Sequence, residues 1–447
     1  MSQRGVARSP ARRRTELGLV VLALLLTGGL YALASLGKAG SLPANIGPFL
    51  GVVCGLLLLA HLGMRRWAPY ADPILLPTAC LLNGIGYVFI ARLNRHLAGL
   101  QAVWTAVGVA AFLVTLGAVR RARDLERYRY TLAFVGIGLL LLPLMPVVGE
   151  NLHGARLWIH FGPITFQPGE LAKTALAVFF ASYMVERAEV LSQGTRRIGR
   201  FLVLDPRYLA PVLGAWGLSL MIFLFENDLG SSFLFFAMFI GMLWVATGRA
   251  HYLTLGAVLF VAGATFALKV IGHAKGRVRT WIDPWPLYNT TGYQIIQAMF
   301  AMAAGGVFGK GPGLGSPQRI PVVATDFIFA AIAEELGLLG AAAVLAAFLL
   351  MVGSGLRVAI RCDRPFEKLL ATGLSIILGI QTFVILGGVT RIIPLTGITL
   401  PFVSYGGSSL IANYILLAVL LRISNDSAMP PGPASPAPDR DTVLAAP

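Results

Sequence analysis

The sequence predicts an all-α polytopic membrane protein, and three observations lead to this fold class. Of its 447 residues, 56% are hydrophobic and 13% are charged, about half the charged fraction usual in soluble domains. Apolar runs close to the roughly 20 residues needed to cross about 30 Å of hydrocarbon recur along the chain. Basic residues gather in alternate loops between these runs. We therefore expect about 12 transmembrane helices and no large soluble domain.

Each expected helix follows from one apolar run. In chain order the runs cover residues 17–36, 46–63, 74–91, 100–119, 131–148, 171–185, 208–225, 229–246, 252–271, 327–353, 369–389 and 403–422. Residues 1–15 and 425–447 are expected to be disordered, and the second of these segments is rich in Pro and Ala and cannot bury a core.

The net charge of +16 raises the question of nucleic-acid binding, but its distribution indicates membrane topology. Arg and Lys cluster in 12–14, 65–66, 120–129, 187–207 and 357–364, which are alternate loops, so both termini are expected in the cytoplasm. Segment 273–326 is the exception, because it is expected outside and is still basic through Lys275, Arg277, Arg279, Lys310 and Arg319. This large loop predicts an anionic partner other than nucleic acid.

The loop ends at Thr325 and Asp326, directly before the apolar run 327–353. One interpretation is a helix cap, because Thr and Asp favour positions at a helix start. The other is a general base at the membrane surface, kept ionised by the helix N-terminus. These residues alone do not separate the two interpretations.

Two further features of the same loop suggest ligand contacts. Arg277 and Arg279 are two residues apart, so in an extended segment both can face a diphosphate; alternatively, the segment lies on lipid headgroups. Residues 305–315 read Gly-Gly-Val-Phe-Gly-Lys-Gly-Pro-Gly-Leu-Gly, which lacks the spacing of a P-loop. We expect mobile backbone there that can approach a ligand closely.

Charged residues also occur inside or at the boundary of the apolar runs. Charge at such depth is costly and is usually functional or paired. The set comprises Arg156, Glu170, Lys173, Glu226, Asp228 and Lys269. Glu170 and Lys173 are three apart and can pair on one helix face, which gives either a functional or a purely structural ion pair. The six histidines show no metal-ligand spacing, so no metal site is predicted.

Taken together, these segments resemble the SEDS family, the RodA/FtsW polymerases of bacterial peptidoglycan. The matching motifs occur in the family's order: 153–159 (His-Gly-Ala-Arg-Leu-Trp-Ile), 167–173 (Gln-Pro-Gly-Glu-Leu-Ala-Lys), 228–232 (Asp-Leu-Gly-Ser-Ser), 292–294 (Gly-Tyr-Gln), 309–311 (Gly-Lys-Gly), 325–337, 394–397 (Pro-Leu-Thr-Gly) and 400–409 (Leu-Pro-Phe-Val-Ser-Tyr-Gly-Gly-Ser-Ser).

The resemblance implies a core of ten helices, here 73–424, so 16–72 is expected to add two N-terminal helices. It places loop 273–326 outside the cytoplasmic membrane, between the ninth and tenth expected helices. It implies a glycosyltransferase that joins lipid II into glycan strands, beside a class B penicillin-binding protein that cross-links them. Within the family the chain looks closer to the elongation (RodA) branch than to the division (FtsW) branch.

The resemblance also implies functional residues. Asp326 matches the residue to which catalysis is attributed in the family. Substrate contacts are expected at Arg156, Glu170, Lys173, Asp228, Arg279, Gln294, Lys310, Thr325, Ser404 and Ser408. One departure is clear: the family usually has Pro-Glu-x-His before Thr-Asp, whereas residues 321–324 here are Pro-Val-Val-Ala.

The expected reaction is an inverting glycosyl transfer, with Asp326 taking a proton from the acceptor sugar and undecaprenyl diphosphate leaving. Arg156, Lys173, Arg279 and Lys310 are expected to stabilise charge. A divalent cation, Mg or Mn, is an alternative source of that stabilisation, although the sequence shows no dedicated cage. Two other functions stay open at this point: a lipid II flippase and a non-catalytic scaffold for a penicillin-binding protein.

Overall fold

A computed structural model describes residues 11–42, 46–146, 148–152, 155–161, 164–193, 195–198, 201–204, 213–218, 221–222, 225–226, 228–270 and 272–429. Its α-helices are α1 (Ala11–Ala39), α2 (Ile46–Trp67), α3 (Leu75–Leu93), α4 (Arg95–Ala118), α5 (Arg129–Leu141), α6 (Pro168–Gln193), α8 (Leu229–Thr247), α9 (His251–Val270), α10 (Gly272–Ile282), α11 (Tyr293–Gly305), α12 (Ile328–Arg361), α13 (Pro365–Val389) and α14 (Gly407–Ala428).

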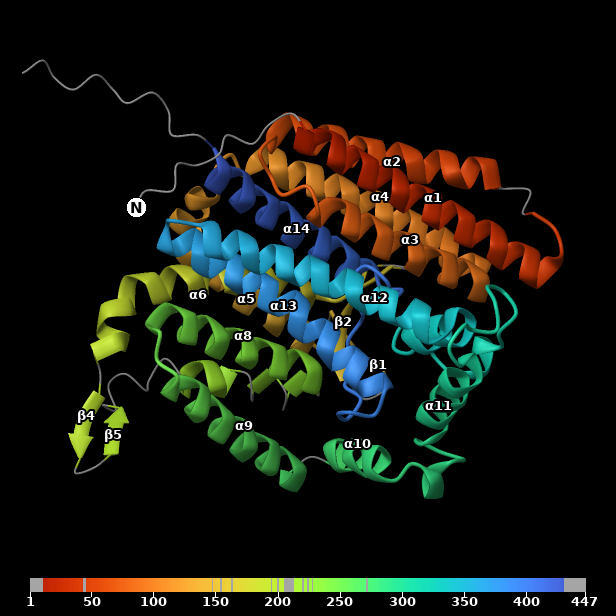
Figure 1. Ribbon diagram of the computed structural model, residues 1–447. Helices are drawn as coiled ribbons and strands as arrows, with labels where there is room; N and C mark the ends of the chain where they lie inside the picture. The colour runs from red at the N-terminus through yellow and green to blue at the C-terminus, as the bar shows by residue number, and fades with distance from the viewer. Residues whose placement is uncertain are drawn as a thin grey trace, which may run out of the picture.

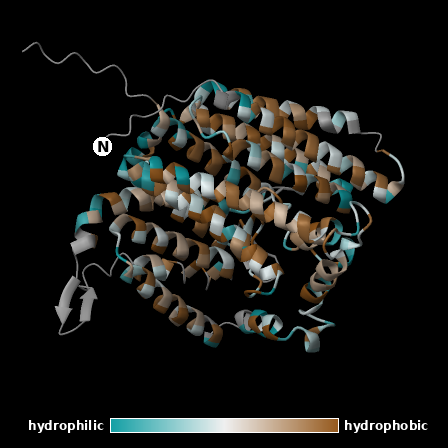
Figure 2. Ribbon diagram, in the orientation of Figure 1, coloured by the Kyte–Doolittle hydropathy of each residue, from teal (hydrophilic) through white to brown (hydrophobic). Residues whose placement is uncertain are grey.

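The long helices form one bundle, with α1 and α2 on one flank and α8 and α9 on the other (Figure 1). Burial follows this arrangement: 89% of the apolar stretch of α14 and 78% of that of α13 are buried, against 22% for α1. Figure 2 shows apolar residues along most of the helix bodies. Most of the apolar surface of α1 is therefore exposed. A helix in contact with water would not expose so much apolar surface, so α1 faces lipid.

The predicted all-α polytopic class is confirmed. Within the described residues, seven helices are long and apolar enough to cross a membrane: α1, α3, α4, α8, α12, α13 and α14. The count of about 12 stays a prediction, since run 208–225 lies largely outside the described residues. Proline explains one difference in length: α5 ends at Leu141 because Pro143 lies in the short 3-10 helix η2 (Leu142–Leu144) that follows.

Small β-sheets were not predicted. Strands β1 (Gly149–Leu152), β2 (Ala155–Phe161) and β3 (Ile164–Phe166) form an antiparallel sheet before α6. Strands β4 (Thr195–Ile198) and β5 (Phe201–Leu204) form a hairpin after it. Strands this short are hard to recognise from sequence because few residues carry the alternating pattern.

The boundaries predicted for the disordered ends were wrong. Helix α1 already begins at Ala11, and α14 continues to Ala428. Polar side chains hold the end of α14: Asn425 Oδ1 accepts a hydrogen bond from Tyr70 N (3.0 Å), and Asp426 Oδ2 accepts one from Ala122 N (2.7 Å). A polar helix end can therefore be structured by contacts with loops distant in sequence.

The extended conformation expected around Arg277 and Arg279 was also wrong, because segment 273–326 includes helices. It contains α10, α11 and the 3-10 helices η3 (Trp285–Leu287) and η4 (Pro317–Arg319). Both α10 and α11 lie at one end of the bundle (Figure 1). The start of α12 packs at the same end, which is called the Asp326 end below.

Candidate active site

Asp326 lies in an irregular turn directly before α12. The helix begins at Ile328 with Phe327 at its N-cap, and Phe327 makes no side-chain cap hydrogen bond. The amides of Thr325 and Asp326 both donate to Val322 O, at 3.2 and 3.3 Å. The N-cap and first-turn positions expected for Thr325 and Asp326 were therefore wrong, since both residues precede the helix.

Segment 390–406, which joins α13 to α14, is bonded to this turn. Tyr405 N donates to Ala324 O (2.9 Å), and Ser404 Oγ donates to Thr325 O. Ser404 Oγ also accepts a hydrogen bond from Leu400 N (3.0 Å). The predicted residues Thr325 and Ser404 are thus brought together, and they fix the backbone on the N-terminal side of Asp326.

Gly397 lies between the Asp326 carboxylate and an arginine. A Cβ at Gly397 would be 3.9 Å from Asp326 Oδ2 and 3.9 Å from Arg277 Nη2. Gly397 has φ +81°, which side chains rarely adopt. Arg277 is fixed by a hydrogen bond from its Nη1 to Thr396 O (2.7 Å). The carboxylate of the Asp326 turn and the guanidinium of Arg277 therefore border the same point at Gly397.

Arg277 takes the place that the sequence assigned to Arg279. Residues two apart on a helix point to different sides, and α10 is helical rather than extended. Arg277 and Trp281 share one face: Trp281 Nε1 donates to Arg391 O (2.9 Å) within segment 390–406. An i,i+4 search for Arg and Trp would have indicated this face.

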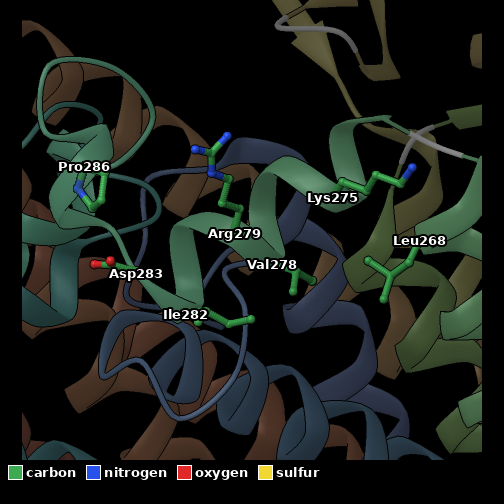
Figure 3. Close-up of a pocket in the computed structure, with 7 residues that line it drawn as sticks. All are labelled: Leu268, Lys275, Val278, Arg279, Ile282, Asp283 and Pro286. Carbon is green, nitrogen blue, oxygen red and sulfur yellow. The ribbon is translucent and has the colours of Figure 1, made fainter.

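Arg279 is exposed and borders a different, open hollow of about 500 Å³. Figure 3 shows its side chain pointing away from Val278 and Ile282. The hollow is lined by Leu268, Lys275, Val278, Arg279, Ile282, Asp283 and Pro286. The expectation that Arg277 and Arg279 face one diphosphate together was wrong.

The predicted pair of Glu170 and Lys173 is connected to segment 390–406 through one intervening residue. Lys173 Nζ is 2.7 Å from Glu170 Oε1, and both side chains are 4% exposed. Lys173 Nζ also donates to Gln381 Oε1 (3.3 Å), whose Nε2 donates to Thr399 O (2.9 Å) in segment 390–406. Lys173 therefore positions the segment through Gln381, a residue that the sequence analysis missed.

Ser408 has a similar structural role at the start of α14. Its Oγ accepts a hydrogen bond from Gln167 N (3.1 Å), which joins α14 to the residue before α6. Next to it, Ser409 Oγ accepts from Thr399 Oγ1 (2.8 Å). The bond between Thr399 and Ser409 holds segment 390–406 on α14 without adding charge near Asp326.

Asp228 supports the same segment from α8. Its carboxylate accepts a hydrogen bond from Ser231 N (3.0 Å) and caps α8. A Cβ at Gly230 would be 2.4 Å from Ile398 Cγ2, so this helix start packs tightly on segment 390–406. Burial raises the pKa of the neighbouring Glu226 to about 8, and the charge of Asp228 adds to the rise. The Asp228 carboxylate, as the cap of α8, holds the helix start that packs on segment 390–406.

Backbone strain gathers at the same place. Within the described part of the chain, three non-glycine residues have positive φ: Val322 (55°), Arg391 (62°) and Phe402 (62°). All three belong to the turn before Asp326 or to segment 390–406. Such conformations cost about 1–3 kcal/mol each and gather at functional sites, so they mark this turn independently of sequence motifs.

The glycine-rich segment 305–316 is held at a different place, by two carboxylates of α12. Lys310 N and Gly311 N donate to the carbonyls of Glu334 and Glu335, both at 3.0 Å. Glu335 Oε2 accepts from Gly313 N (2.7 Å), and Lys310 Nζ is 2.8 Å from Glu334 Oε1. The expectation of mobile backbone was wrong, because buried carboxylates bind its amides.

The remaining predicted residues lie away from Asp326 or are less constrained. Lys310 bonds Glu334, which lies six residues past Ile328 and hence about 9 Å along α12. Arg156 is exposed on β2, and Gln294 is partly buried in the first turn of α11. The motif residue His153 lies outside the described residues.

An apolar cavity of about 390 Å³ opens beside the site. Its wall is contributed by α8, α9, α10, α13 and segment 390–406, and it includes Phe233, Phe236, Phe260, Phe383, Ile393 and Pro394. Arg277 and Thr396 also line it. Arg277, whose guanidinium borders Gly397, therefore also lines a space suited to a hydrocarbon chain.

A family model described as cell cycle protein, FtsW/RodA/SpoVE, matches residues 86–429. The chain belongs to this family. The FtsW/RodA/SpoVE match covers the Asp326 turn, segment 390–406 and the glycine-rich segment. It confirms the family indicated by the sequence motifs.

Relatives within the family are similar over most of this chain. It is 41% identical over 432 residues to peptidoglycan glycosyltransferase RodA of Mycobacterium bovis, covering 94% of this chain and 92% of that protein. It is 34% identical over 341 residues to the probable peptidoglycan glycosyltransferase FtsW of Geobacter metallireducens, covering 76% and 85%. The higher identity to RodA agrees with the branch predicted from the sequence.

Solved structures support the fold. A mutant of rod shape determining protein RodA from Thermus thermophilus gives a TM-score of 0.56 at 28% identity, covering 80% of this chain and 98% of that one. A structure on the coordination of polymerization and crosslinking by a peptidoglycan synthase complex gives 0.57 at 27% identity, covering 85% and 97%.

Proposed function

We propose that this protein is a peptidoglycan glycosyltransferase that polymerises lipid II. The Asp326 end faces the outer side of the cytoplasmic membrane of a bacterium, with both termini in the cytoplasm. One observation carries the proposal: the Asp326 carboxylate and the Arg277 guanidinium border one point at Gly397, and Arg277 also lines an apolar cavity. A base, a cation and a lipid-sized space are the parts needed for glycosyl transfer from a lipid diphosphate.

Asp326 acts as the general base. It takes the proton from an acceptor sugar hydroxyl while that oxygen forms a bond to the anomeric carbon of the donor. The bond between this carbon and the diphosphate oxygen breaks, and the electron pair leaves with undecaprenyl diphosphate. Attack opposite the leaving group inverts the anomeric carbon. A positioned base of this kind contributes about 10²- to 10⁴-fold to the rate.

Arg277 is suited to the leaving diphosphate. Its Nη1 is held by Thr396 O, while its Nη2 borders the point shared with Asp326. A guanidinium held in one orientation stabilises developing phosphate charge without reorganising. The apolar cavity takes the first isoprene units of the lipid, so the lipid chain and its diphosphate occupy adjoining spaces.

The described residues do not offer a ready site for a divalent cation. In the described ranges, no group of three or more His, Cys, Asp or Glu side chains could hold a metal ion. Asp326 and Arg277 provide a carboxylate and a cation instead of a set of oxygen ligands.

A class B penicillin-binding protein is the proposed partner, as a transpeptidase that cross-links the new strands. The similar solved structure concerns the coordination of polymerization and crosslinking in a peptidoglycan synthase complex. Our protein supplies polymerisation in such a pair.

The first test uses purified protein in liposomes that contain lipid II and the penicillin-binding protein. Asp326→Asn keeps the shape of the side chain but removes the base, so we expect glycan synthesis to fall by about 10²-fold or more. The matched control is Asp283→Asn, which changes an exposed carboxylate of the same end of the bundle and should retain wild-type synthesis.

Three results would overturn the proposal. Normal polymerisation by Asp326→Asn would remove the proposed base. Lipid II movement across the bilayer by the wild type without polymer would indicate a flippase, whose transport step needs no base. Binding of the penicillin-binding protein without either activity would indicate a scaffold.

A further inference from the structure

The end of α1 contacts the glycine-rich segment backbone to backbone. A Cβ at Gly37 would be 2.1 Å from Pro312 O, and one at Gly313 would be 2.2 Å from Ala34 O. Gly313 has φ +81°. The two segments can approach this closely only because neither glycine carries a side chain. In Figure 1 this end of α1 lies on the same side of the bundle as α11 and the start of α12.

Helix α3 joins the same contact. Lys38 Nζ, near the end of α1, donates to Arg92 O (2.7 Å). Arg92 Nη2 donates to the carbonyls of Gly313 (3.1 Å) and Gly315 (2.9 Å). Arg92 Nε also forms an ion pair with Glu335 Oε1 at 3.1 Å. The orientation of the Nε–H group does not meet hydrogen-bond geometry. Arg92 therefore links α1, the glycine-rich segment and α12.

Helix α1 is itself fixed on α3 and α2. A Cβ at Gly84 of α3 would be 2.1 Å from Thr27 Oγ1, so α1 packs into α3 at a glycine. Near the other end, His61 Nδ1 of α2 is 2.7 Å from Glu16 Oε1 of α1, and both side chains are buried. The contact with Pro312 and Gly313 is thus made by a helix with little freedom to move.

The glycine-rich segment in turn fixes the first part of α12. Glu334 and Glu335 bind its amides, and Gly337 (φ +68°), two residues after Glu335, breaks the helix. The piece between Phe327 and Gly337 is consequently held at two places: by Ser404 on Thr325 O at its start, and by the glycine-rich segment at its end. Asp326 precedes this piece by one residue.

We propose that α1 is a positioning element for the Asp326 turn. Its end fixes the glycine-rich segment, and this segment fixes the piece of α12 that follows Asp326. The inference rests on the proposed function for its kinetic consequence, but the contact itself is testable without any activity. It gives a purpose to at least one of the two helices that precede the expected core.

The test compares Gly37→Ala with Gly29→Ala in the full-length protein. Both changes add the same methyl group to α1 and the same helix propensity. At Gly29 nothing lies within 4 Å of the new Cβ, whereas at Gly37 the backbone of Pro312 must move. We expect hydrogen exchange in residues 309–316 to accelerate roughly tenfold in Gly37→Ala and not in Gly29→Ala.

The kinetic readout separates positioning from loss of the fold. We expect Gly37→Ala to lower kcat for polymerisation by roughly tenfold with an unchanged KM, because a displaced base slows the chemical step without weakening binding. Lys38→Met removes the donor to Arg92 O and should also lower kcat. Lys38→Arg keeps a donor to Arg92 O and should retain the wild-type kcat.

Equal hydrogen exchange and equal kcat in Gly37→Ala and Gly29→Ala would overturn the inference. If Gly37→Ala fails to accumulate, Lys38→Met and Lys38→Arg are compared instead. Equal kcat in these two variants would also overturn the inference. A wild type without polymerase activity would refute the proposed function, yet the exchange comparison would still decide whether α1 holds the segment.

Discussion

Two irregular segments at the Asp326 end are held by different chemistry. Segment 390–406 is fixed mainly by neutral groups, through Ser404, Ser409 and Gln381. The glycine-rich segment 305–316 is fixed by charged groups, through Arg92, Glu334 and Glu335. Both are rich in family motifs, so motif content alone does not tell which one borders the reacting carboxylate.

The difference follows from the electrostatics of a base. A carboxylate close to Asp326 would disfavour its ionised form, because two like charges at one site cannot both ionise easily. Glu334 and Glu335 are instead about 9–10 Å along α12 from its start at Ile328, and they are matched by Lys310 and Arg92. Neutral hydroxyls and amides near Asp326 give rigidity without a competing charge, and the cation at that site is Arg277.

The largest effect is expected from breaking the charged network. Arg92→Met removes the cation from the buried Glu335, whose side chain is 1% exposed. Removing one partner of a buried ion pair costs about 3–5 kcal/mol, because the other charge stays buried. We expect that loss in the free energy of unfolding, measured by denaturant titration in detergent micelles.

The control for Arg92→Met is Arg95→Met, an exposed position at the start of α4. Its free energy of unfolding should stay within about 0.5 kcal/mol of the wild type. Equal destabilisation by the two variants would show that the glycine-rich segment does not depend on its charged network.

The second effect concerns segment 390–406 and its cation. Arg277→Met removes the guanidinium that borders Gly397, and we expect kcat/KM for lipid II to fall roughly 10- to 100-fold, the range of a charged hydrogen bond. Arg279→Met removes an equal charge two residues away on the exposed side of α10 and should change kcat/KM less than about 2-fold. A larger fall in kcat/KM for Arg279→Met than for Arg277→Met would indicate that Arg279 contacts the substrate, as expected from the sequence.

Apolar runs predicted the helix positions well because the bilayer sets their length and composition. Run 229–246 became α8 (Leu229–Thr247), and run 74–91 became α3 (Leu75–Leu93). The same reasoning failed for α10 (11 residues) and α11 (13 residues), since helices this short hold no apolar run near the length of a span. Because α10 was not predicted as a helix, the sequence favoured Arg279 over Arg277. The face of the helix decides which side chain reaches Thr396, and that side chain is Arg277.

Motifs predicted Asp326, Thr325 and Ser404 as parts of one site, and the structure brings them together. What they could not give is the role of each residue. The pair of Lys173 and Glu170, three apart on one helix, could be predicted and is confirmed. Lys310 looks like a free cation in sequence, but it is paired with Glu334 of the following helix α12. That pairing depends on how the glycine-rich segment packs on α12, which local spacing in the sequence does not reveal.

The smallest effect is expected from one neutral group of segment 390–406. Ser404→Ala leaves Leu400 N without its acceptor and Thr325 O without its donor. Each bond contributes about 1 kcal/mol net, so we expect the free energy of unfolding to fall by about 1–2 kcal/mol and kcat to fall several-fold. The matched control is Ser375→Ala, a buried serine whose Oγ donates to Ala371 O of its own helix α13 (2.7 Å). That carbonyl can keep its helical hydrogen bond, so Ser375→Ala should leave kcat unchanged. If both serine variants behave alike in kcat, neutral hydrogen bonds on segment 390–406 do not position Asp326, and the charged network alone would carry that task.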